Sequence, residues 1–297
     1  MQARSGDAVV RVRGLTKSYA GHPAVAGIDL DIAAGEIFAL LGPNGAGKTT
    51  TVEILEGFRE RDGGEVSVLG HDPAHRDRGW RARLGVVLQS TGETGELTVS
   101  ELVRHFAGFY PRPRDPEAVI EMVGLSAKRT ARAGSLSGGQ RRRLDVALGI
   151  VGDPELLFLD EPTTGFDPQA RRSFWDLLRM LREGGTTMVL TTHYLDEAEH
   201  LADRVAVIAA GRLLDVDTVE RLGGEGRRTP YVRWREAGTL REERTDDPTG
   251  AVVSLAQRLG QVPDLEVRRP SLEDVYLSMI ADAGLDPVAA PVDVEAS

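Results

Sequence analysis

The string GPNGAGKTT, residues 42 to 50, combines the residue types that hold a phosphate group. Its glycines permit left-handed backbone and close approach of a ligand, and successive N–H groups at a helix start form an anion-binding nest. Lys48 would reach the β- and γ-phosphates of a nucleotide, and the Thr49 hydroxyl would ligate Mg²⁺. The predicted nucleotide-binding residues here are Gly42, Pro43, Asn44, Gly45, Ala46, Gly47, Lys48, Thr49 and Thr50.

Two adjacent carboxylates, Asp160 and Glu161, follow the apolar run from Leu156 to Leu159. A buried parallel strand presents its C-terminal end at the ligand crevice of an α/β protein. Asp160 would therefore hold Mg²⁺, directly or through water. Glu161 is placed to orient and deprotonate an attacking water molecule.

A second candidate phosphate site is LSGGQ, residues 136 to 140, which opens a helical pattern. Ser137 can cap this helix, and the two glycines after it leave the backbone bare. The phosphate loop already encloses the phosphates from its own chain. The second site is therefore most useful if it faces the nucleotide of another subunit. The residues predicted to do so are Ser137, Gly138, Gly139 and Gln140.

The spacing of apolar residues predicts the elements that position these motifs. Residues 9–13 and 28–32 alternate with period two and indicate half-buried strands. Short apolar runs separated by helical patterns indicate a mostly parallel sheet covered by helices. The runs expected to form that sheet are 36–41, 84–88, 156–159, 187–191 and 205–209.

Helical patterns at 99–110, 118–123 and 139–151 predict a helical insertion, a subdomain over about residues 92–145. A boundary is expected near the glycine-rich segment 223–226. We predict a nucleotide-binding domain over 9–222, a small C-terminal α+β domain over 223–281, and a loose tail over 282–297. Ser271 to Asp274 is a predicted capping box for the last helix.

Composition narrows the functional classes. The chain has 297 residues, a formal net charge of −10 and no cysteine, which excludes disulfides and thiolate metal sites. An acidic chain is a poor candidate for non-specific nucleic-acid binding, so we expect no nucleic-acid partner. No apolar run approaches the roughly 18 residues of a membrane helix, and no extended apolar signal region opens the chain. Any membrane role is expected to work through a partner.

The order of these motifs over residues 9 to 220 resembles the nucleotide-binding subunit of an ATP-binding cassette (ABC) transporter. The resemblance implies an α/β, P-loop NTPase (RecA-like) fold, with ATP and Mg²⁺ as ligands. It implies that Tyr19 stacks on adenine, that Gln89 contacts Mg²⁺ and the attacking water, and that His193 contacts the γ-phosphate. Asp167 resembles the residue that links two sites across a dimer, although Phe166 stands where the family commonly has Leu. The implied metal ligands are Thr49, Gln89 and Asp160.

The segment Pro270 to Leu277 and the string Thr163 to Pro168 resemble those of bacterial drug-resistance-type exporter ATPases. This implies an ATPase at the cytoplasmic face of the membrane and a separate membrane-spanning permease. One phosphate loop and one LSGGQ in the chain predict a head-to-tail dimer, either a homodimer or a heterodimer. Phe106, Phe109 and Tyr110 form either a groove for a permease helix or part of the core.

The alternative function is a soluble ATPase of the same family that acts on ribosomes or DNA. A GTPase is excluded, because its base-reading motif needs an Asn-Lys-x-Asp string and Asn44 is the only asparagine.

Overall fold

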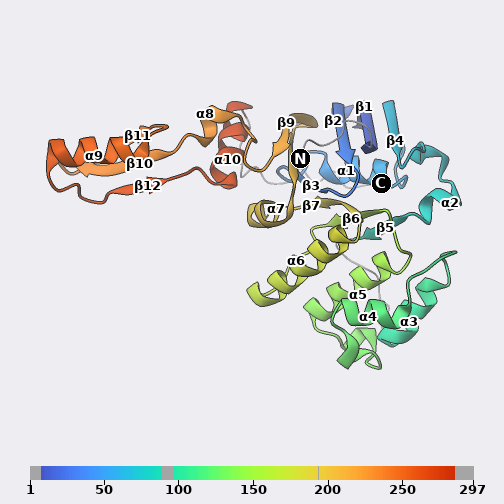
Figure 1. Ribbon diagram of the computed structural model, residues 1–297. Helices are drawn as coiled ribbons and strands as arrows, with labels where there is room; N and C mark the ends of the chain where they lie inside the picture. Colours follow the sequence, from blue (N-terminus) through green and yellow to red (C-terminus); the bar gives the residue numbers. More distant parts are fainter. Residues whose placement is uncertain (1–7, 89–95, 193, 285–297) are drawn as a thin grey trace.

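The computed structural model describes residues 8–88, 96–192 and 194–284. Its central sheet has the strand order β5-β6-β7-β3-β8-β9, and the pairs from β5 to β8 are parallel, whereas β9 is antiparallel to β8. This arrangement confirms the predicted α/β class with a mostly parallel sheet (Figure 1). The bounds are β3 Ile37–Leu41, β5 Leu84–Val87, β6 Leu156–Asp160, β7 Thr187–Thr191, β8 Arg204–Ala209 and β9 Arg212–Thr218.

The central strand β3 shows how the sheet separates two hydrophobic cores. Every residue of β3 is buried. Ile37, Ala39 and Leu41 point to a core shared with the helices α3 to α7 and α10. Phe38 and Leu40 point to the opposite core, shared with α1 (Lys48–Leu55) and an antiparallel sheet. Because both faces are covered, the strands of this sheet read as continuous apolar runs.

The antiparallel sheet has the order β2-β1-β4, with β1 at Ala8–Tyr19, β2 at His22–Ala33 and β4 at Gly63–Val68. Both β1 and β2 are 12 residues long, so they extend well beyond the predicted 9–13 and 28–32. Their outer halves carry mainly exposed or half-buried residues. Hydrophobic periodicity does not reveal such segments, because little of them is buried.

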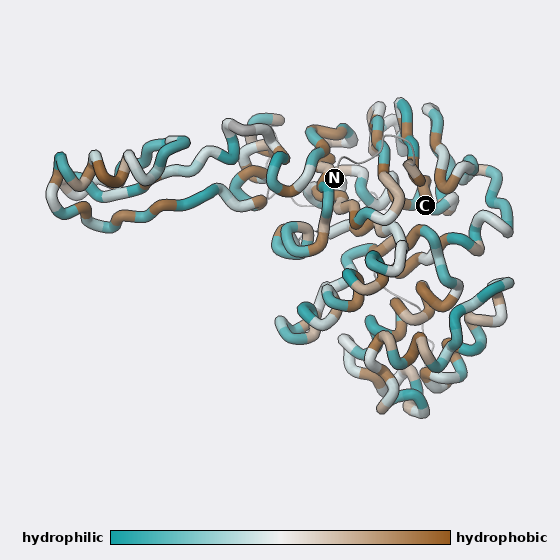
Figure 2. Tube along the Cα trace, in the orientation of Figure 1, coloured by the Kyte–Doolittle hydropathy of each residue, from teal (hydrophilic) through white to brown (hydrophobic). Residues whose placement is uncertain are grey.

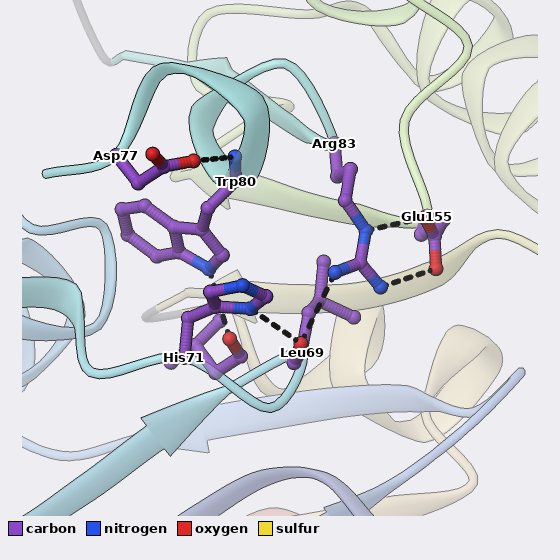
Figure 3. Close-up of polar contacts among 7 residues, drawn as sticks. Leu69, His71, Asp77, Trp80, Arg83 and Glu155 are labelled. Atoms are coloured by element: carbon purple, nitrogen blue, oxygen red, sulfur yellow. Dashed lines mark hydrogen bonds and ion pairs between the residues drawn. The ribbon is translucent and has the colours of Figure 1, made fainter.

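A compact set of polar contacts joins the two sheets (Figure 3). The indole of the buried Trp80, in α2 (Arg78–Arg81), donates to the carbonyl of Val68 at 2.8 Å. Arg83 donates to the carbonyl of Leu69 at 3.1 Å and pairs with Glu155 at 2.6 and 2.9 Å. The end of β4 is thereby tied to the starts of β5 and β6.

The helices between β5 and β6 form the part drawn at the foot of Figure 1. They are α3 at Val99–Ala107, α4 at Pro116–Met122 and α5 at Gly138–Ile150. The helix α3 begins at a capping box formed by Thr98 and Glu101. It ends at Ala107, three residues before the predicted end. Short 3₁₀ turns at Ser126–Lys128 and Ala133–Ser135 lead into α5.

On the other side of β6, α6 (Pro168–Glu183) and α7 (Leu195–Leu201) alternate with β7 and β8. Beyond β9 and α8 (Glu225–Arg228), the chain forms an arm that extends away from the central sheet (Figure 1). The arm comprises β10 (Tyr231–Glu236), β11 (Thr239–Arg244), α9 (Pro248–Leu259) and β12 (Glu266–Arg268). The turns of α9 carry both hydrophobic and hydrophilic residues, as expected for a helix that covers one face of a sheet (Figure 2).

The arm has a small core of its own, made of Val232, Trp234 and Leu255 with their neighbours. The last helix, α10 (Leu272–Asp282), starts at the predicted capping box of Ser271 and Asp274. Its buried residues belong instead to the large core of the main body. These residues are Leu272, Val275, Met279 and Ile280. The domain limits at 223 and 281 stay a prediction.

Candidate functional site

The phosphate loop connects β3 to α1 at the carboxyl edge of the parallel sheet. A Cβ atom on Gly42 would lie 2.2 Å from the carbonyl oxygen of Ile208, and one on Gly47 would lie 2.2 Å from that of Ala24. Gly47 also has a φ of +100°, which L-residues rarely adopt. Neighbouring strands therefore enforce glycine at both positions, and the loop is built as a close-fitting cradle of backbone.

Lys48 is the cation of this cradle. Its side chain is buried, and its ammonium donates to the carbonyls of Gly42 at 2.7 Å and Pro43 at 3.1 Å. Burial lowers the pKa of Lys48, while Glu161 and Asp160 raise it. The ammonium thus lies within electrostatic reach of both carboxylates at the end of β6.

Asp160 and Glu161 are held by the neighbouring strand β7. One carboxylate oxygen of Asp160 accepts a hydrogen bond from the Thr191 hydroxyl. The backbone N–H of Glu161 donates to the carbonyl of Thr191 at 3.0 Å. Glu161 has a φ of +44°, so the chain turns sharply here and its carboxylate accepts from the Thr164 hydroxyl at 3.4 Å. The Thr191 contacts could not be read from the sequence, since they depend on the order of the strands.

The LSGGQ segment forms the start of α5, as predicted. Ser137 caps the helix by accepting from the N–H of Gln140 at 3.4 Å, and Gln140 accepts from the N–H of Ser137 at 3.2 Å. A Cβ atom on Gly138 or Gly139 would meet nothing within 4 Å, and neither has a positive φ. Nothing within the described part of the chain therefore requires glycine at these two positions.

The phosphate loop and LSGGQ begin helices in different parts of the chain. The loop leads into α1, which packs beside the antiparallel sheet. LSGGQ leads into α5, among the helices at the foot of Figure 1.

Three further predicted residues have defined surroundings. The ring of Tyr19, at the end of β1, lies 5.2 Å from the guanidinium carbon of Arg59 and 5.7 Å from the ammonium of Lys17. Asp167 caps α6 by accepting from the N–H groups of Gln169 at 2.9 Å and Ala170 at 2.8 Å. Adenine stacking by Tyr19 and a dimer contact by Asp167 stay predictions. Gln89 and His193 lie outside the described residues, as does the predicted tail beyond residue 284.

Phe166, the departure from the family pattern, is buried and packs edge-on against Phe174 at a centroid distance of 5.5 Å. Its ring is part of the large core, which explains how an aromatic residue is accommodated before Asp167.

Sequence reasoning missed a buried carboxyl group beside this turn. Glu197, in α7, is fully buried, beside the side chains of Thr163, Thr192 and Trp175. Burial raises its pKa, whereas Thr192, Thr163 and Trp175 lower it. These side chains come from the segments on either side of Asp167 and His193. The only signal in the sequence was that Glu197 falls on the same helical face as Leu201.

Sequence reasoning also missed Arg142, five residues after Ser137 in α5. Its guanidinium binds backbone carbonyls at the end of β5 and on both sides of Glu161. It lies within a run of three arginines, so its type and position did not distinguish it.

A buried lysine, a glycine cradle and two carboxylates lie at one edge of the sheet. Binding and cleavage of a nucleoside triphosphate require these groups. Asp160 and the exposed Thr49 supply oxygen donors of the kind that Mg²⁺ prefers. Within residues 8–88, 96–192 and 194–284, no group of three or more His, Asp or Glu residues is arranged to hold a metal ion. No helix in this part of the chain has the length and apolarity to cross a bilayer.

Comparison with known proteins agrees with this geometry. The family model described as ABC transporter matches residues 25–164. The daunorubicin resistance ATP-binding protein DrrA3 of Streptomyces coeruleorubidus is 37% identical, over 93% of this chain and 97% of its own length. The Nod factor export ATP-binding protein I of Rhizobium meliloti (strain 1021) is 40% identical, over 91% of this chain and 87% of its own.

Solved structures show the same fold. An ATP-binding subunit of an ABC transporter superposes with a TM-score of 0.69 at 21% identity, covering 91% of this chain and 99% of that chain. This coverage includes most of the chain beyond the region that the family model matches.

Proposed function

The chain belongs to the ABC transporter family, and on that premise we propose that it is the ATP-hydrolysing subunit of an exporter. Members of the family bind ATP, and hydrolysis is coupled to transport. The chain supplies the energy, and a separate membrane-spanning permease supplies the path. The protein then acts at the cytoplasmic face of the membrane, held there by that permease.

The observation that carries the proposal is the bare start of α5. Gly138 and Gly139 have room for side chains and no backbone need for glycine, yet both lack a Cβ. A helix N-terminus with exposed N–H groups and a favourable dipole binds anions. We propose that it receives the γ-phosphate of an ATP molecule held by Lys48 of a second copy. Two copies arranged head to tail then enclose two nucleotides.

Each residue of the loop edge has a distinct part in hydrolysis. The loop backbone and Lys48 bind the β- and γ-phosphates, while Thr49, Asp160 and Gln89 hold Mg²⁺. When bound there, Mg²⁺ would supply positive charge that offsets the charge of the phosphates. Glu161 accepts a proton from the attacking water, helped by His193. Loss of the γ-phosphate removes the contact that joins the two copies, so hydrolysis opens the dimer.

Export is supported by the names of the relatives, which concern daunorubicin resistance and Nod factor export. These compounds differ in chemistry, so the ATP-binding chain does not define the substrate. A drug or another small hydrophobic compound is the substrate class that we propose. The soluble alternative on ribosomes or DNA has no support from these relatives.

The first arm of the test is Glu161→Gln. Loss of a general base commonly lowers the rate by about 10²–10⁴-fold. ATP binding should remain, so ATP should convert the variant from monomer to a stable dimer in sizing experiments. Hydrolysis at the parent rate would show that Glu161 is not the base.

The second arm asks whether each site draws on two chains. Lys48→Ala and Ser137→Arg should each abolish ATPase activity alone. In a mixed dimer, the loop of the Ser137→Arg chain faces the intact LSGGQ of the Lys48→Ala chain, so activity should reappear on mixing. No recovery, with both variants folded and dimeric, would contradict the shared site.

A further inference from the structure

The side chain of Arg142 connects the helix that starts at LSGGQ to both edges of the hydrolytic site. Its Nε donates to the carbonyl of Pro162 at 3.0 Å, and one Nη donates to the carbonyl of Asp160 at 2.6 Å. The other Nη donates to the carbonyl of Leu88, immediately after β5. A single guanidinium thus joins three backbone positions on two strand ends.

These acceptors surround the residues that carry the chemistry. Asp160 and Pro162 are the neighbours of Glu161 on either side, and Leu88 directly precedes Gln89. The position of the Glu161 carboxylate depends on the sharp turn at this residue, whose φ is +44°. Hydrogen bonds to the carbonyls before and after the turn restrain it from both sides.

The surroundings show why an arginine stands here. Arg142 is 7% exposed, so burying its charge requires compensation. Burial lowers the pKa of Arg142, while the carboxylates of Asp145, Asp160 and Glu197 act against that effect. Arginine presents donors in a rigid planar fork, whereas a lysine ammonium cannot reach three separated carbonyls with the same geometry.

We propose that Arg142 is a positioning residue that couples the LSGGQ helix to the hydrolytic carboxylates of the same chain. This inference rests on the proposed head-to-tail dimer. There, α5 contacts the nucleotide of one site, while Asp160 and Glu161 serve the other. Movement of α5 on binding the γ-phosphate in one site is then transmitted through Arg142 to the turn at Glu161 in the second site.

The neighbouring Arg143 provides a matched control. It lies in the same helix and carries the same charge, but it donates to the carbonyl of Val123 at 3.1 Å, within the helical part alone. Its loss should leave the turn at Glu161 unchanged.

The experiment compares Arg142→Lys, Arg142→Met and Arg143→Met in the full chain. Affinity for a fluorescent ATP analogue should stay within about twofold in all three, since Arg142 does not touch the phosphate loop. Misplaced catalytic groups cost up to about 10²-fold in rate, so we expect kcat to fall about tenfold or more in both Arg142 variants. Arg143→Met should stay within about twofold.

Arg142→Lys keeps a buried positive charge and Arg142→Met removes it, so the two substitutions affect folding differently. Thermal unfolding of both variants therefore distinguishes a misfolded chain from one in which only the catalytic groups are displaced. A kcat for Arg142→Lys within about twofold of the parent would overturn the proposal, because charge without the fork would then suffice.

The mixed dimer of Lys48→Ala and Ser137→Arg chains tests whether Arg142 acts on the carboxylates of its own chain. Arg142→Lys in the Ser137→Arg chain disturbs the carboxylates of the single competent site. The same change in the Lys48→Ala chain disturbs only the helix that presents LSGGQ to that site. Action on the carboxylates of the same chain predicts loss of activity for the first placement alone, and equal loss for both placements would overturn the proposal. Absence of activity in the parent mixed dimer would instead count against the proposed dimer.

Discussion

Burial shifts the pKa values of two charged groups, one at each end of α1, in opposite directions. It lowers the pKa of Lys48 and raises that of Glu56, at the C-terminal end of α1, to about 8. Lys48 gives its hydrogen bonds to two carbonyls, which are weaker partners for an ammonium than phosphate oxygens. A bound phosphate therefore favours the charged form of Lys48 and adds to its own affinity.

The raised pKa of Glu56 predicts a specific pH dependence of stability. Burial is the main cause, and the charges of Glu53 and Asp160 add to it. Between the ordinary value of 4.5 and about 8, the folded chain keeps a proton that the unfolded chain releases, so stability falls as pH rises. Glu56→Gln removes this loss. We expect the variant to gain on the order of 1–3 kcal/mol over the parent at pH 8.5 and little at pH 4.5.

Chemical denaturation across this pH range, without nucleotide or Mg²⁺, measures the difference. Glu60→Gln is the control, because Glu60 is exposed and its contact with Arg76 is long, at 3.6 Å. A difference between Glu56→Gln and the parent that does not change with pH would contradict the expectation.

Single residues also show where sequence reasoning stopped. The phosphate loop and the Ser137 cap were predictable, because local spacing alone determines their chemistry. Arg142 and Thr191 were not, since their partners are distant in sequence and depend on which strands and helices are neighbours. Glu197 was not, because its burial depends on the same packing.

At the scale of elements, burial decides which strands and helices can be predicted from the sequence. The runs that became β3, β6 and β7 were predicted almost to the residue, because continuous burial makes them continuously apolar. The strand β11 was missed, because all six of its residues are exposed and carry no alternation. The short helix α2 was missed because one buried residue, Trp80, gives no periodicity.

The aromatic residues at the end of α3 separate into two groups. Phe106 and Tyr110 pack against the large core, and a Cβ on Gly152 would lie 2.4 Å from the Tyr110 ring. Phe109 is 67% exposed and contacts His105 and Phe106 edge-on at 5.1 and 5.9 Å. The core explanation therefore fits Phe106 and Tyr110, and Phe109 alone remains available to a permease helix.

We expect Phe109→Glu to reduce transport and permease-stimulated ATPase activity at least about tenfold, as for loss of an aromatic anchor at an interface. Basal activity of the isolated chain should stay within about twofold, because the ring does not reach the phosphate loop. Reconstitution in vesicles with the membrane subunit that co-purifies with the chain measures both rates. Met180→Glu, which charges another exposed position, in α6, is the control. Equal transport by the two variants would remove Phe109 from the interface.

At the scale of the whole molecule, the C-terminal region divides between two cores. The arm packs on itself through Val232, Trp234 and Leu255. In contrast, α10 contributes to the core that also contains α7, the helix that follows His193. The segment after β9 is therefore partly an independent unit and partly a component of the ATPase body.

This division predicts opposite consequences for two deletions. Tyr231 pairs with Arg268 across β10 and β12, so the two ends of the arm lie side by side. Replacing residues 232–267 by an Asn-Gly turn should leave unfolding of the body and nucleotide affinity nearly unchanged. Removing everything after Pro270 deletes four buried side chains of α10, each contributing about 1.5–3 kcal/mol. The melting temperature of this truncated chain should fall by on the order of 10 °C or more.

Point substitutions in α10 separate packing from chain length. Ile280 is fully buried and Leu277 is 40% exposed, on the same helix. Ile280→Ala should lower the free energy of unfolding by about 2–5 kcal/mol, and Leu277→Ala by no more than about 0.5–1 kcal/mol. Calorimetry of the full chain measures both changes. If Ile280→Ala unfolds with the parent while excision of the arm destabilises the body, then the arm supports the ATPase and α10 does not. That result would reverse the assignment of the two cores.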